Sequence, residues 1–156
     1  MRMTHMVLAA ALFAGVSTIA IAAQDADSKE QKVTLEQLPA AVQTAVKEQS
    51  KGATVKGFAI ENENGKKLYE AELTVNGHAK DISFDARGAI VSVEEETTLD
   101  KIPAPARAAL EKAAGQGKIV IVEVVTEGGK TSYEAQINND KKTSEVAVDA
   151  SGRSVK

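Results

Sequence analysis

The sequence contains no cysteine and no tryptophan, and only 3% of its 156 residues are aromatic. Without cysteine the chain cannot form disulfide bonds, thiolate nucleophiles or cysteine-based metal sites, so packing alone must stabilise the fold. The shortage of aromatic residues bears on recognition, because high-affinity protein interfaces are anchored by tryptophan, tyrosine and arginine. An interface of that tight, aromatic kind is therefore not expected.

Histidine is almost as scarce, and His78 is the one histidine outside the first 23 residues. Catalysis through histidine needs a partner that positions the imidazole, and one histidine without cysteine cannot build a usual zinc site. Residues 62–65 match the middle of a calcium-binding EF-hand loop, but Ile60 and Ala71 occupy its first and twelfth ligand positions. We therefore predict a protein that is not an enzyme and that has no metal or other cofactor.

The N-terminal segment, residues 1–23, has the pattern of a secretory signal peptide. Arg2 precedes an apolar run over residues 6–21, and Ala20-Ile21-Ala22 fits the small-residue rule for cleavage, after either Ala22 or Ala23. An uncleaved membrane anchor is the alternative, but the run is short and no cationic stop follows it. We expect a periplasmic or secreted protein without a membrane span after cleavage. The net charge of −3 gives no indication of nucleic-acid binding.

The remaining chain contains a duplication at a spacing of 64 residues. Gly-Lys-Lys-Leu-Tyr-Glu-Ala at residues 65–71 returns as Gly-Lys-Thr-Ser-Tyr-Glu-Ala at residues 129–135, and Asp85-Ala86-Arg87-Gly88 returns as Asp149-Ala150-Ser151-Gly152. A match that keeps one register indicates a repeated unit. We predict a flexible tether over residues 24–32, a first repeat over residues 33–96 and a second over residues 97–156.

Each predicted repeat begins with a helix and continues with strands. Thr34 and Gln37 have the spacing of a capping box, and Pro39 suits the first turn of a helix over residues 39–50, which returns over residues 103–114. Alternation predicts three or four strands after each helix. The expected fold class is α+β: two tandem repeats, each a helix followed by a three- to four-stranded antiparallel meander, with the helices on one face of the sheet. Residues 119–125 are apolar on both faces, as in a strand that is covered twice or lies where the copies meet.

The motifs together resemble the tandem PepSY-like repeats that are grouped with the beta-lactamase-inhibitor-protein fold. The resemblance is carried by Leu-Pro-Ala at residues 38–40, by the repeated Gly-Lys-x-x-Tyr-Glu-Ala strand and by the Asp-Ala-x-Gly turn. It implies an exported, non-catalytic module that binds proteins or regulates or inhibits a peptidase. The partner would be an exported protein, such as a peptidase or another enzyme. A periplasmic protein that binds a small ligand or a cation is the alternative function.

The candidate binding surface is the sheet face that points away from the helices. If the apolar residues of each strand face the helix, alternation places acidic residues on the opposite face. We expect a cationic partner there, although a polar solvent-facing sheet is the simpler explanation. The predicted face consists of Glu70, Glu72, Asp81, Asp85, Glu94, Glu134, Glu145 and Asp149.

Overall fold

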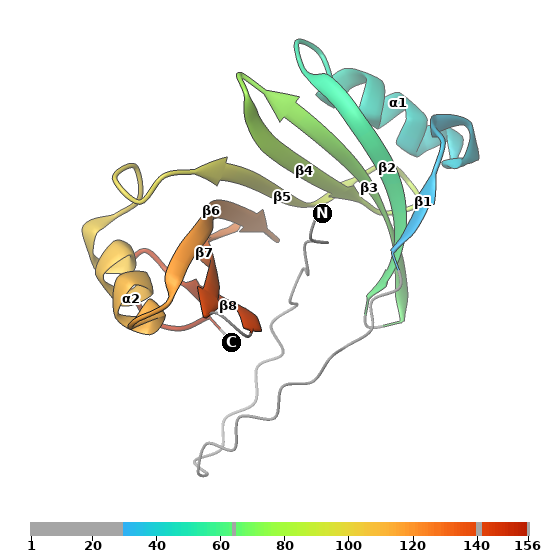
Figure 1. The fold of residues 1–156 in the computed structure, drawn as a ribbon. Coiled ribbons are helices and arrows are strands. Elements are labelled where there is room, and N and C mark those ends of the chain that lie inside the picture. The colour runs from blue at the N-terminus through green and yellow to red at the C-terminus, as the bar shows by residue number, and fades with distance from the viewer. Residues whose placement is uncertain (1–29, 64, 140–141, 156) are drawn as a thin grey trace.

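The protein is mostly β-structure, as a computed structural model that describes residues 30–63, 65–139 and 142–155 shows (Figure 1). The strands are β1 (Gln31–Val33), β2 (Thr54–Glu63), β3 (Lys66–Val75), β4 (His78–Phe84), β5 (Ile90–Thr97), β6 (Lys118–Glu127), β7 (Lys130–Asn139) and β8 (Lys142–Val148). A one-turn 3-10 helix (Leu35–Gln37) precedes helix α1 (Ala40–Gln49), and helix α2 (Ala104–Ala114) lies between β5 and β6.

All eight strands form one antiparallel sheet, in the order β1 to β8. The predicted α+β architecture of two units, each a helix with its own small meander, is therefore wrong. Strand β5 extends to Thr97, into the predicted second repeat, and pairs with β6 from Ser92↔Glu127 to Thr97↔Val122. The pairing gives hydrogen-bond partners to two strands that would otherwise be edges, and this joins the two halves into one sheet.

Strand β1 occupies the end of the segment predicted to be a tether. Residues Gln31, Lys32 and Val33 pair with Ile60, Ala59 and Phe58 of β2. A strand of three residues is too short to show an alternating pattern in the sequence. It forms by pairing with the edge of β2. The capping box is present as predicted: the Thr34 backbone N–H donates to Gln37 Oε1 at 2.8 Å, but it begins the 3-10 helix and not α1.

Two hydrophobic cores lie between the sheet and the helices. Val42 and Val46 of α1 pack with Leu73, Ile82 and Phe84 of the first core. The second core contains Ala106, Leu110 and Ala114 of α2 together with Val122, Ala135, Ile137 and Val148.

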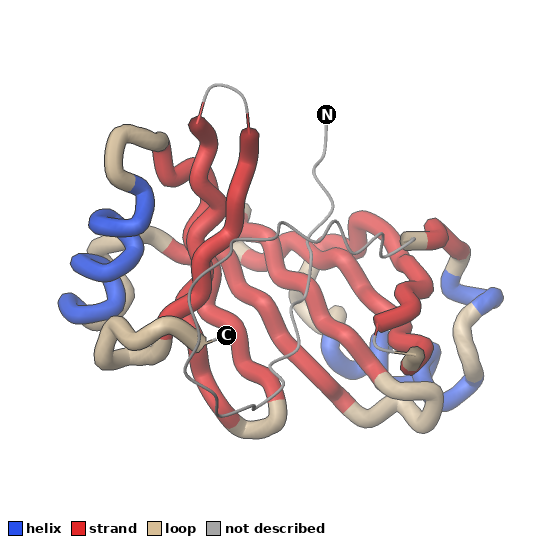
Figure 2. The backbone as a smooth tube through the Cα atoms, turned by 90° about the horizontal axis from the view of Figure 1, so that it is seen from below, coloured by secondary structure: helices blue, strands red, loops and turns tan. Residues whose placement is uncertain are grey.

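Both cores lie on the same face of the sheet. Val93 packs against the first core, and Val122 of the second core is paired with Thr97, which lies on the same side of β5 as Val93. Figures 1 and 2 show a strongly curved sheet with both helices outside the curve. The other face is therefore the concave one. No helix among the described residues is long and apolar enough to cross a membrane.

The Asp-Ala-x-Gly turns lock each half of the sheet onto its helix. Gly88 has a φ of +78°, and an added Cβ would lie 2.6 Å from the carbonyl oxygen of Ala41 in α1. Gly152 has a φ of +81°, and its Cβ would lie 2.6 Å from the carbonyl oxygen of Pro105 in α2. Both the left-handed conformation and the close approach to a backbone require glycine.

Strand registers recur at the 64-residue spacing. Tyr69 pairs with Phe84, and Tyr133 pairs with Val148. The register shift between Val55 and Gly57 in β2 has its counterpart between Ile119 and Ile121 in β6. Side chains 64 residues apart consequently face the same side of the sheet, and this places two sets of acidic residues on the concave face.

Candidate functional site

The concave face contains a row of carboxyl groups that runs across six neighbouring strands. Alternation along β3 turns Tyr69, Ala71 and Leu73 into the first core, so Glu70 and Glu72 face the other way. Strand register then aligns acidic residues of successive strands, which we call the acidic row: Glu70 and Glu72 on β3, Asp81 on β4, Glu94 and Glu96 on β5, Glu123 on β6, Glu134 on β7 and Glu145 on β8.

Many members of the acidic row are direct cross-strand neighbours. Glu72 pairs with Asp81, and Asp81 pairs with Glu94. In the second half Glu96 pairs with Glu123, which pairs with Glu134. Like charges in such positions repel each other, since opposite residues of antiparallel strands have Cβ atoms about 4.5–5.5 Å apart. Packing of the sheet does not require acidic residues at these paired positions.

The centre of the acidic row is buried, which is rare for carboxyl groups. Glu70, Asp81 and Glu94 each expose 7% of their surface, and Glu123 exposes 5%. Glu61 of β2 is buried as well and adds a further carboxyl group beside the row. Glu134 and Glu145 are partly exposed, so the row reaches solvent over β7 and β8.

Burial and mutual repulsion keep Glu70 protonated at neutral pH. Loss of hydration is the larger cause, and the nearby carboxylates of Glu61, Asp81, Glu94 and Glu72 add to it, so that the pKa of Glu70 rises to about 9. A carboxyl group with this pKa is a proton donor at pH 7, and it becomes an anion once a cation binds beside it.

Glu134 behaves in the same way and forms a hydrogen bond with Glu145. Burial is again the first cause of its raised pKa, followed by the side-chain hydrogen bond with Glu145 and by repulsion from Glu145, Glu94 and Glu123. The protonated Glu134 carboxyl donates this hydrogen bond to the Glu145 carboxylate. This hydrogen bond links β7 and β8, which lie next to each other in the sheet.

Gln136 lies beside this pair and has an unsatisfied acceptor. It is on the same face of β7 as Glu134 and directly opposite Glu145 of β8. Only 5% of its surface is exposed, and its Oε1 has no hydrogen-bond partner among the described residues. A buried carbonyl oxygen without a donor costs about 1–3 kcal/mol. The position therefore suits a ligand that brings N–H groups or positive charge.

Two residues predicted for this face lie elsewhere. Asp85 sits in the turn after β4, where its Oδ1 accepts from the backbone N–H groups of Arg87 and Ala89 at 2.8 and 3.0 Å. Asp149 does the same for Ser151 and Arg153 at 2.8 and 3.1 Å.

These bonds stabilise the charged form of each aspartate. Hydrogen bonding by Arg87, together with that from Ala89, lowers the pKa of Asp85, and hydrogen bonds from Ser151 and Arg153 lower the pKa of Asp149. Both aspartates therefore hold turns, and the structure does not bring them to the acidic row.

The structure adds residues that sequence reasoning missed, notably Glu61, Glu123 and Gln136. Glu123 interrupts an otherwise apolar run, and only its pairing with Glu96 and Glu134 places it in the row. Gln136 stands 64 residues after Glu72, so the duplication itself was the signal that could have identified it. The other predicted members, Glu70, Glu72, Asp81, Glu94, Glu134 and Glu145, do lie on the face away from the helices, as the registers show.

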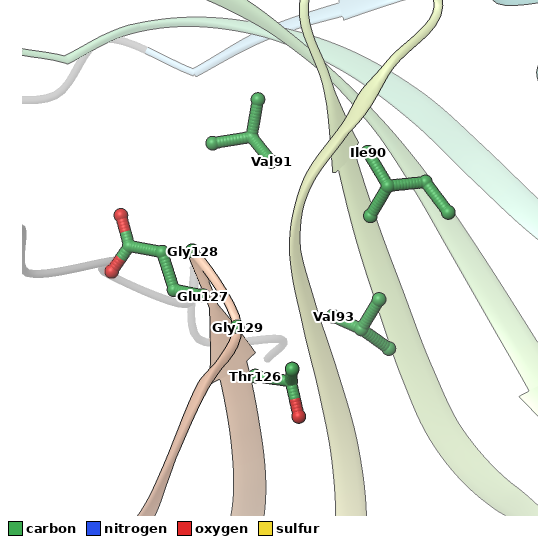
Figure 3. Close-up of a pocket in the computed structure, with 7 residues that line it drawn as sticks. All are labelled: Ile90, Val91, Val93, Thr126, Glu127, Gly128 and Gly129. Carbon is green, nitrogen blue, oxygen red and sulfur yellow. The ribbon is translucent and has the colours of Figure 1, made fainter.

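The described residues offer no other chemical site of comparable definition. They contain no group of three or more histidine, cysteine, aspartate or glutamate residues placed to hold a metal ion. A hollow of about 370 Å³ lies where β5 begins beside the β6–β7 turn, and Figure 3 shows that aliphatic side chains line most of it. Its lining consists of Ile90, Val91, Val93, Thr126, Glu127, Gly128 and Gly129, which include no nucleophile with a base beside it.

Comparison with solved structures places the fold among small bacterial proteins. A protein from Bacteroides eggerthii described as a putative periplasmic protein shares 20% identity and a TM-score of 0.62, over 76% of this chain and 86% of the other. A DUF2874 family protein from Bacteroides ovatus shares 20% identity and a TM-score of 0.60, over 77% and 86%. A BLIP-like protein from Bacteroides fragilis shares 19% identity and a TM-score of 0.55, over 74% of this chain and 82% of the other.

No curated protein sequence matches the chain significantly. The family model described as "Putative beta-lactamase-inhibitor-like, PepSY-like" matches residues 24–78 and again residues 67–155. These two matches span both halves of the sheet and the whole acidic row. The chain therefore belongs to the PepSY-like, beta-lactamase-inhibitor-like family.

Proposed function

We propose that the chain is an exported, non-catalytic module that binds a cationic segment of a partner protein on its concave, acidic face. The partner we propose is an exported protein, such as a peptidase or another enzyme, and the inhibitor-like description of the family supports an enzyme. The location rests on the periplasmic description of a structural neighbour and on the N-terminal sequence pattern. The observation that carries the proposal is the acidic row, which aligns like charges across six strands.

The charge pattern of the concave face supports a cationic partner. Lys66, Lys118 and Lys130, which alternation places on this face, stand at the ends of their strands, and Lys32 lies on the edge strand β1, so the acidic row itself contains no basic residue. A field of one sign speeds encounter with an oppositely charged surface, and salt weakens it because the screening length is about 10 Å at 0.1 M. A cation that binds also relieves the repulsion between paired carboxylates.

The protonation of Glu70 and Glu134 couples this binding to protons. A bound cation favours the charged carboxylate, so the raised pKa values fall and protons are released. Binding should therefore strengthen as the pH rises toward these pKa values. A surface that merely faces water would show neither this coupling nor a dependence on salt.

The test is capture of exported proteins on the immobilised protein, at about 50 mM and about 500 mM salt. We expect a partner with a basic surface that is held at low salt, released at high salt and lost with the double variant Glu70→Lys, Glu134→Lys. The milder variant Glu134→Gln, Glu145→Gln should weaken the same interaction. Circular dichroism must show that each variant is folded.

The matched control is Glu48→Lys with Glu111→Lys, which introduces two lysines at exposed positions on the two helices. The control should retain the partner. If wild type, row variants and control capture the same proteins at both salt concentrations, the acidic row is not a binding surface.

A further inference from the structure

The second half of the acidic row differs from the first at one position. At the 64-residue spacing, Glu70 and Asp81 correspond to the acidic Glu134 and Glu145, but Glu72 corresponds to the neutral Gln136. The exchange replaces a carboxylate with an amide whose carbonyl oxygen is buried and lacks a partner among the described residues. The β7–β8 end of the face therefore differs chemically from the corresponding part of the first half.

The neighbours of Gln136 supply acceptors and apolar contact. Ile121 of β6 is its cross-strand neighbour on one side and offers no polar atom. Glu145 of β8 is the neighbour on the other side, and the proton of Glu134 is already used in the bond to Glu145. Among the described residues of β6 and β7, the basic residue that register brings nearest is Lys118, which is paired with Asn138, two pairs further toward the strand end.

These features define the ligand that would fit. It must donate to the Gln136 carbonyl oxygen and to the Glu145 carboxylate, which come from adjacent strands, and it must pack against Ile121. A guanidinium group has five N–H donors in a rigid planar fork that can satisfy a carboxylate and a neighbouring carbonyl together. An ammonium group is a more strongly hydrated point charge and gains less from the apolar side.

We propose that Glu134, Gln136 and Glu145 form a subsite for an arginine side chain of the cationic partner. The subsite rests on the proposed function of the concave face and adds a preference for arginine over lysine. Glu134 and Glu145 are partly exposed, so an arginine can enter from solvent and reach the buried amide. The entering guanidinium favours the charged form of Glu134 and provides the donor that Gln136 Oε1 lacks.

The experiment compares two capped peptides that differ only in having three arginines or three lysines, titrated into the protein at about 50 mM salt. We expect the arginine peptide to bind about fivefold or more tightly, since one additional hydrogen bond contributes about 1 kcal/mol. Gln136→Leu should reduce this ratio to near one, because it removes the carbonyl oxygen that a guanidinium would contact together with the Glu145 carboxylate.

Asn138→Leu is the matched control, because Asn138 is an exposed amide two residues along the same face of β7. It should keep the full preference for arginine. The side-chain amide signals of Gln136 in the wild-type NMR spectrum give a readout that needs no variant, and the arginine peptide should shift them more than the lysine peptide does.

The outcomes separate the two proposals. If both peptides bind equally well to the wild-type protein, or if Gln136→Leu keeps the preference, the arginine subsite is wrong and the acidic face stands. If neither peptide binds at low salt, both the face and the subsite are wrong.

Discussion

Glu70 shows most clearly how the concave face lowers the stability of the protein at neutral pH. Its carboxyl group lies among other acidic side chains and exposes 7% of its surface. Burial with nearby negative charge raises its pKa from 4.5 to about 9, so folding at neutral pH requires the group to take up a proton. Selection for stability alone would favour a neutral residue, and this supports a role for the carboxyl group in binding.

Replacement of Glu70 by glutamine tests this cost through the pH dependence of stability. Between pH 4.5 and about 9 the folded protein holds a proton on Glu70 that the unfolded chain has lost. The free energy of unfolding therefore falls as the pH rises through this window, by up to ~1.4 kcal/mol per pH unit. We expect Glu70→Gln to be more stable than wild type at about pH 8 and to differ little at about pH 4.

Thermal unfolding of both proteins across the pH range measures this difference. The exposed Glu111→Gln is the control, and its curve should run parallel to that of wild type. The prediction would be contradicted if the Glu70→Gln curve also ran parallel. Subtracting the wild-type curve removes the contribution of Glu134, which titrates in the same direction.

At the scale of elements, the contacts between each turn and its helix fix the position of the helix against the sheet. Gly88 N–H donates to the Asp85 carbonyl oxygen at 2.9 Å, and Gly152 N–H donates to that of Asp149 at 2.9 Å. Each glycine then lies against the first turn of its helix without space for a Cβ. The repeated turn is thus a packing element as well as a change of chain direction.

Gly88→Ala should destabilise the protein by more than backbone strain alone explains. Alanine at a φ of +78° is strained by about 1–3 kcal/mol, and its Cβ would also collide with the Ala41 carbonyl. Gly52→Ala is the control, because Gly52 has a φ of +77° but no atom near the position of a Cβ. Urea unfolding should show a loss larger by at least about 1 kcal/mol for Gly88→Ala. Equal losses would mean that the helix moves aside without cost.

The helices and hairpins were predictable because their signals are local. Prolines at helix starts, Asn76-Gly77 between β3 and β4, and apolar alternation all act within a few residues. The Asp85 and Asp149 assignments failed for a physical reason: alternation was extended past the strand end into turns, where side chains bond the backbone. Strand β1 was missed because it has no stable structure without β2 beside it.

At the scale of the molecule, the joining of the halves was the part that sequence could not settle. The apolar run over residues 119–125 suggested a strand at a junction, but both a separate covered strand and a shared sheet were consistent with it. The decision depends on pairing between β5 and β6, which lie on either side of α2, and no local pattern encodes that register. The full acidic row could not be predicted for the same reason, since it crosses the junction between β5 and β6.

Because the sheet is continuous, neither half should fold alone. A fragment that ends at Glu96 would expose β5 as an edge, and one that begins at Thr97 would expose β6 with apolar side chains on both faces. We expect proton NMR spectra with poor dispersion for each fragment. Mixing the two should restore dispersion if the β5–β6 pairing is what each lacks. Well-dispersed spectra from both separate fragments would show that they are independent domains.

The strand order also matters while the chain is still being made. Each strand pairs with the one before it, so a chain that emerges from its N-terminus can add every new strand to a sheet already present. At any moment only the most recent strand presents an open edge on the growing side. The edge of β5 stays unpaired for the longest time, because residues 98–117, including α2, must emerge before β6. We expect the three consecutive glutamates of β5, Glu94 to Glu96, to disfavour pairing with foreign strands during this interval, and two of them, Glu94 and Glu96, belong to the acidic row.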